Sequence, residues 1–152
     1  MNPDSQPMVL AYRLRSYQTV ATQTAAPGQL VVMLYDGAIR FLERALGGFE
    51  YDDPLEFNRT INNNILRAQE ILVELNHSLD LDRGGKLAGT LRNLYAYMNH
   101  QLTLSNTRKS PEGIHDTIRR LSVLRDAWNE IQKRQEQVDG HQRPYEAFAA
   151  AS

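Results

Sequence analysis

The sequence contains no cysteine, no long uniformly apolar run and almost no net charge. Without cysteine it can form no disulfide and no thiolate metal site, which fits a reducing compartment. Lys and Arg total 17 against 18 Asp and Glu, so the formal charge of -1 gives no general attraction to nucleic acid or anionic lipid. Residues 1–10 lack the basic stretch and apolar run of a signal peptide. We therefore expect a cytoplasmic protein that neither binds nucleic acid nor inserts into membranes.

Sequence motifs of catalysis are also missing, including G-x-S-x-G, the P-loop and G-x-G-x-x-G. Two Glu-x-x-His motifs, Glu74 with His77 and Glu112 with His115, are of the kind that di-iron helical bundles use. In an antiparallel bundle these two motifs would lie roughly 30 Å apart, because one ends a helix and the other begins a helix parallel to it. Residues 86–110 contain no Asp or Glu that could bridge two metals. We therefore expect no enzyme, no metal and no cofactor.

The sequence does contain helical periodicity, in four stretches separated by short breaks rich in Gly, Pro, Asp or Ser. The expected helices cover residues 27–46, 54–79, 86–108 and 110–135. The clearest core stripe lies in the second stretch, at alternating steps of four and three: Ile61, Ile65, Ala68, Leu72, Leu75 and Leu79. Helices of similar length joined by short loops lie antiparallel to their neighbours. The sequence thus predicts an all-α fold, an antiparallel up-down four-helix bundle.

The bundle domain is expected to cover residues 27–137, with different segments on either side. Residues 1–26 form a cap segment and lead-in, in which four side chains can share one side of a short helix: Val9, Leu10, Leu14 and Tyr17. Residues 138–152 hold a glycine, a proline and an alanine-rich end, with too little apolar surface to offset the entropy of ordering. We predict a disordered tail over 138–152.

The first bundle helix carries more apolar surface than one seam requires. Its apolar side chains fill an arc of roughly 200° when projected at 100° per residue. Two interpretations remain open here: the helix lies deep in the bundle or beneath the N-terminal segment, or the arc is a groove for a partner helix. A second stripe on the third helix would extend such a groove through Tyr95, Tyr97 and Leu104, because tyrosine combines contact area with a polar edge.

Four separate sequence patterns follow one another over residues 12–131. The patterns are Tyr17-Gln18 followed by Thr24-Ala25-Ala26-Pro27-Gly28-Gln29-Leu30-Val31-Val32-Met33-Leu34-Tyr35-Asp36-Gly37-Ala38; Arg67-Ala68-Gln69-Glu70-Ile71-Leu72-Val73-Glu74-Leu75; Leu94-Tyr95-Ala96-Tyr97-Met98; and Leu124-Arg125-Asp126-Ala127-Trp128. In their order and similar spacing they resemble the patterns of the FliS family of flagellin export chaperones. The matching positions that the resemblance singles out are Tyr17, Pro27, Leu30, Leu34, Tyr35, Leu94, Tyr95 and Trp128.

The resemblance implies a cytoplasmic chaperone that binds the disordered C-terminal segment of flagellin, keeps it from polymerising and assists its delivery to the flagellar type III export apparatus. Taken with the apolar arc, it gives a set of candidate flagellin-binding residues: Tyr17, Leu30, Val32, Tyr35, Ile39, Leu42, Leu46, Tyr95, Tyr97 and Leu104. Weak homodimerisation through an uncovered groove stays open. The alternative is a non-catalytic helical adaptor that binds another amphipathic helix.

Overall fold

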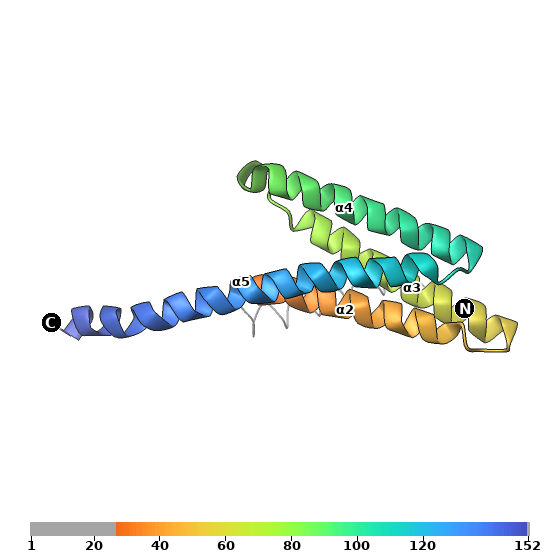
Figure 1. Ribbon diagram of the computed structural model, residues 1–152, viewed down its shortest axis with the longest axis horizontal. Helices are drawn as coiled ribbons and strands as arrows, with labels where there is room; N and C mark the ends of the chain where they lie inside the picture. Colours follow the sequence, from red (N-terminus) through yellow and green to blue (C-terminus); the bar gives the residue numbers. More distant parts are fainter. Residues whose placement is uncertain (1–26, 152) are drawn as a thin grey trace.

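The computed structural model describes residues 27–151, together with the side chains of residues 28–138 (Figure 1). Over this range it contains no strand and four helices, which keep the labels of Figure 1: α2 (Pro27–Gly48), α3 (Pro54–His77), α4 (Leu81–Arg108) and α5 (Glu112–Ala151). The predicted all-α four-helix fold is confirmed. The predicted cap segment, Tyr17 included, lies outside the described residues.

The four helices form a ring in which each one packs against two neighbours. Consecutive helices run antiparallel, and α5 returns to lie beside α2 (Figure 1). The contact between α2 and α3 is the most extensive, while α4 packs less extensively against both α3 and α5. Figure 1 shows α4 diverging from α5 toward the N-terminal end of α4. The bundle is therefore closed most tightly around α2 and most loosely around α4.

Small residues on α2 explain its close approach to α3. A Cβ atom added at Gly37 would stand 3.4 Å from Ile71 Cδ1, and one at Gly48 would stand 3.0 Å from side-chain atoms of Ile61 and Thr60. Close packing of this kind excludes water from the apolar side chains and stabilises the bundle. The buried apolar side chains form one core: Leu34, Tyr35, Ala38, Ile39, Leu42, Ala45, Ile61, Ile65, Ala68, Ile71, Leu72, Leu75, Leu91, Tyr95, Met98, Leu102, Ile114 and Leu121.

The connection between α3 and α4 differs from the expected turn over residues 80–85. The Asp80 carboxylate accepts a hydrogen bond from the backbone N–H of Arg83 at 3.1 Å, which caps a helical turn that begins at Leu81. Gly85 then takes a left-handed φ of 53°, which a residue with a Cβ atom adopts only with strain, and the helix kinks there. The helix proper follows from Lys86, as the sequence predicts.

The last helix of the structure extends beyond the predicted end of the bundle domain at residue 137. Helix α5 continues without a break through residues 138–151 and extends past the bundle (Figure 1). The boundary at residue 137 and the disordered tail over 138–152 stay predictions. No helix in the described range is long and apolar enough to cross a bilayer.

Candidate binding groove

A pair of tyrosines forms a polar contact inside the apolar core. Tyr35 on α2 and Tyr95 on α4 are almost fully buried, and their hydroxyl oxygens lie 2.5 Å apart. Burial raises the pKa of both hydroxyls, because the charged form would lose its hydration. Side-chain hydrogen bonding with Tyr95 and with Trp128 on α5 lowers the pKa of Tyr35, but burial has the larger effect. This tyrosine pair therefore joins helices that lie across the ring from each other.

The structure places the candidate binding residues of α2 mainly inside the bundle. Because α2 lies between α3 and α5, two neighbours share its broad apolar arc. Four of the ten candidates belong to the core: Tyr35, Ile39, Leu42 and Tyr95. Four others are half-buried: Leu30, Val32, Leu46 and Leu104. The arc is thus largely filled by the bundle itself, and the core residues can act on a partner only through neighbours that reach the surface.

Among the candidates in the described residues, Tyr97 is the one that is exposed, at 42%. The guanidinium of Arg120 on α5 lies 4.7 Å from the centre of the Tyr97 ring, a cation–π contact. Arg120 Nε in turn donates a hydrogen bond to the Asp116 carboxylate at 2.9 Å. One face of Tyr97 is therefore covered by a charged side chain, and the ring helps to hold α4 against α5.

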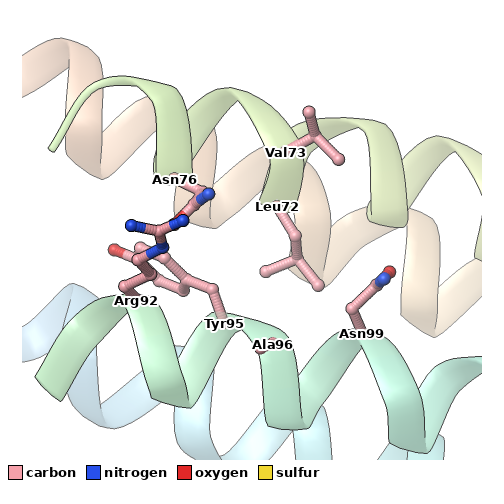
Figure 2. Close-up of a pocket in the computed structure, with 7 residues that line it drawn as sticks. All are labelled: Leu72, Val73, Asn76, Arg92, Tyr95, Ala96 and Asn99. Carbon is pink, nitrogen blue, oxygen red and sulfur yellow. The ribbon is translucent and has the colours of Figure 1, made fainter. Parts of the chain in front are cut away.

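An open groove lies between α3 and α4, with a volume of about 220 Å³. It is lined by Leu72, Val73 and Asn76 from α3 and by Arg92, Tyr95, Ala96 and Asn99 from α4 (Figure 2). The short side chain of Ala96 leaves space between the helices opposite Leu72 (Figure 2). Because Tyr95 also belongs to the core, the groove reaches down to the tyrosine pair.

Polar contacts close the α3–α4 interface on one side of this groove. Gln69 Nε2 donates hydrogen bonds to Thr103 Oγ1 at 2.9 Å and to the Asn99 carbonyl at 3.2 Å. Farther along, Asn106 Nδ2 donates to Asn62 Oδ1 at 2.9 Å. Exposed hydrogen bonds of this type contribute little net stability, since water competes for the same groups. Beside the groove, α3 and α4 are therefore joined by polar as well as apolar contacts.

Two polar side chains of the groove have no partner within the described part of the chain. The Asn76 Oδ1 atom is shielded from solvent and accepts no hydrogen bond. Arg92 forms no ion pair among residues 28–138, in keeping with the lack of any Asp or Glu on α4 after Asp82. Most buried polar atoms in proteins are hydrogen-bonded. The groove thus combines an apolar floor with polar groups that are available to a ligand.

Sequence reasoning missed most of this groove. It assigned Leu72 to the core and named Tyr95, but it did not single out Val73, Asn76 or Arg92. The available signals were an apolar residue and an amide outside the core stripe of α3, and the acid-free surface of α4. These signals point to no site until the packing of α3 on α4 brings them together.

The described residues contain no group of three or more His, Asp or Glu side chains that could hold a metal ion. The two Glu-x-x-His motifs lie near the C-terminal end of α3 and the N-terminal end of α5, at opposite ends of the bundle (Figure 1).

Fold and groove together define a small four-helix bundle with an open groove between α3 and α4. Comparison with known proteins gives the family: residues 10–135 match the family described as Flagellar protein FliS. The chain therefore belongs to the FliS family.

Relatives from several bacteria match most of the chain and carry the name Flagellar secretion chaperone FliS. The protein of Bacillus subtilis is 31% identical over 115 residues, which cover 76% of this chain and 82% of the relative. That of Salmonella typhimurium is 32% identical over 129 residues, covering 82% and 93%. That of Campylobacter jejuni is 30% identical over 122 residues, covering 80% and 91%.

Proposed function

We propose that this protein is a flagellar secretion chaperone that binds the disordered C-terminal segment of flagellin in the bacterial cytoplasm. By occupying that segment it keeps flagellin from polymerising, and it assists delivery to the flagellar type III export apparatus. The observation that carries the proposal is membership of the FliS family, whose relatives named above are flagellar secretion chaperones. The proposal includes no catalytic step and no cofactor.

The α3–α4 groove supplies a physical means of holding such a segment. A disordered chain loses conformational entropy when it binds, so it needs apolar contact together with satisfied backbone hydrogen bonds. The groove offers Leu72, Val73 and Ala96 for the first requirement, and Asn76 and Arg92 for the second. Val73 is 48% exposed, so a ligand side chain can reach it without opening the core.

The first test is titration calorimetry with a synthetic flagellin C-terminal segment and a scrambled version of it. We expect selective binding of the native segment, with a negative heat-capacity change from apolar burial. Equal binding of both peptides, or no binding at high micromolar concentration, would contradict the proposal. Preferential binding of an unrelated amphipathic helix would favour the adaptor alternative.

A matched pair of variants tests whether the groove takes part. Val73→Asp places a charge on the groove wall, whereas Val123→Asp makes the same change on α5 at a position that is 69% exposed and outside the groove. We expect Val73→Asp to weaken binding roughly tenfold, through lost apolar contact and an unfavourably placed charge, with Val123→Asp near wild type. Equal affinities of the two variants would show that flagellin binds elsewhere.

An unoccupied groove also leaves apolar surface exposed, and we propose weak homodimerisation of the free protein through it. Sedimentation equilibrium should then show a concentration-dependent dimer that dissociates when the flagellin segment is added. A dimer that persists at saturating peptide would place the self-association on another surface.

A further inference from the structure

The side-chain amide of Asn76 is the least satisfied polar group of the described structure. Its Oδ1 atom is the one buried side-chain oxygen or nitrogen among residues 28–138 that lacks a hydrogen-bond partner. An unmade hydrogen bond at a buried acceptor is unfavourable, and native proteins contain few of them. Because Asn76 lines the α3–α4 groove, a ligand in that groove can supply the missing partner.

The surroundings of Asn76 narrow the chemistry of that partner. Figure 2 shows Arg92 reaching from α4 toward Asn76 on α3, at one end of the groove. Arg92 presents donors only, whereas the carboxamide of Asn76 presents one acceptor and an NH₂ group. A fitting ligand therefore offers both a hydrogen-bond donor for Asn76 and an acceptor for the two side chains.

One residue of an extended chain offers this combination, since its own N–H and C=O point to the same side. The carboxamide of Asn76 can pair with both at once, and its terminal torsion is broad, so the amide can turn toward the groove at small cost. A helical segment would not serve, because its backbone groups already bond to each other. An extended segment leaves them free.

We propose that Asn76 binds the main chain of an extended stretch of the chaperoned segment, with Arg92 holding a neighbouring backbone carbonyl. This inference rests on the proposed chaperone function and assigns its recognition mode at the groove. Every residue except proline carries the same backbone N–H and C=O groups. This contact therefore depends on the extended conformation of the segment and not on the identity of its side chains. Side chains of the segment on Leu72 and Val73 supply the apolar part of the contact.

The test is a backbone N-methyl scan of the flagellin C-terminal segment, in which each peptide N–H is methylated in turn. Methylation removes one donor without changing any side chain. With the wild-type protein we expect one position at which it weakens binding roughly 5- to 30-fold. With Asn76→Leu, which has no acceptor, the unmodified segment should bind more weakly, and methylation at that position should have no further effect.

Asn93→Leu, an exposed change on α4 outside the groove, is the matched control and should retain the wild-type methylation profile. A thermal melt separates binding from structure: Asn76→Leu removes an unpaired acceptor, so its Tm should equal or exceed that of the wild type. An identical methylation profile for wild type and Asn76→Leu would overturn the inference while leaving the chaperone proposal intact. Failure of the wild type to bind the unmodified segment would overturn both.

Discussion

Removing the hydroxyl groups of the buried tyrosine pair should have unequal effects on stability. Tyr35→Phe and Tyr95→Phe each delete one oxygen and keep the aromatic ring, so apolar packing is preserved. The Tyr35 hydroxyl faces both Tyr95 and the Trp128 indole, whereas Tyr95 has only Tyr35 as a hydroxyl partner. Tyr35→Phe thus removes the partner of the buried Tyr95 hydroxyl and of the half-buried Trp128 indole, whereas Tyr95→Phe leaves the Tyr35 hydroxyl with its contact to Trp128.

The magnitudes follow from the cost of an unpaired buried polar group. Tyr95→Phe should lower the free energy of unfolding by about 1 to 1.5 kcal/mol, and Tyr35→Phe by about 2 to 3 kcal/mol. The double variant loses the shared contact only once, so its loss should fall short of the sum by about 1 kcal/mol. For a domain of this size, each kcal/mol corresponds to about 4 °C in Tm.

Urea unfolding followed by circular dichroism measures all four proteins, with an unchanged slope showing that the folded and unfolded states expose the same surface. The double-mutant cycle then gives the coupling between the two hydroxyls. Equal losses for the two single variants, together with strict additivity in the double variant, would refute the assignment of a shared buried contact.

Three further predictions concern pH, close packing and an ion pair between helices. Burial raises the pKa of both tyrosines above 10.0. Their contribution to folding stability is therefore complete below pH 10 and is lost as pH rises beyond it. The double phenylalanine variant should show a shallower loss of Tm at alkaline pH. Gly113→Ala should destabilise the protein by about 1 to 3 kcal/mol in urea unfolding, since its Cβ would lie 2.3 Å from Ser105 Oγ. Gly89→Ala, whose Cβ meets no atom within 4 Å, should stabilise it by about 0.5 to 1 kcal/mol. The reverse order would contradict the α4–α5 packing. Asp36→Asn removes the carboxylate charge from the 3.2 Å ion pair with Arg125 between α2 and α5. Because both side chains are partly exposed, the loss of stability should stay below about 1 kcal/mol and vanish in 1 M salt.

Helix existence and the core of α3 were predictable because they depend on local periodicity. Ile61, Ile65 and Ala68 are buried as their spacing predicts. Helix ends were less predictable, since they depend on single side chains: Asp80 caps a turn that sequence reasoning left outside the helix. The role of the α2 arc could not be read from its width, because a helix with two packed neighbours and a helix with one neighbour and a free groove show the same apolar pattern.

The sequence by itself determined the fold class, the four helical segments and the likeness to one family, because periodicity, turn residues and motif order are properties of the chain alone. Tertiary structure decided which apolar residues are available to a partner. Tyr35 and Ile39 are buried because α3 and α5 pack on either side of α2. Asn76 and Arg92 line the same groove because α4 packs along α3. A site made from two helices exists only after those helices pack. The periodicity of one helix does not show which side chains the neighbouring helix contributes.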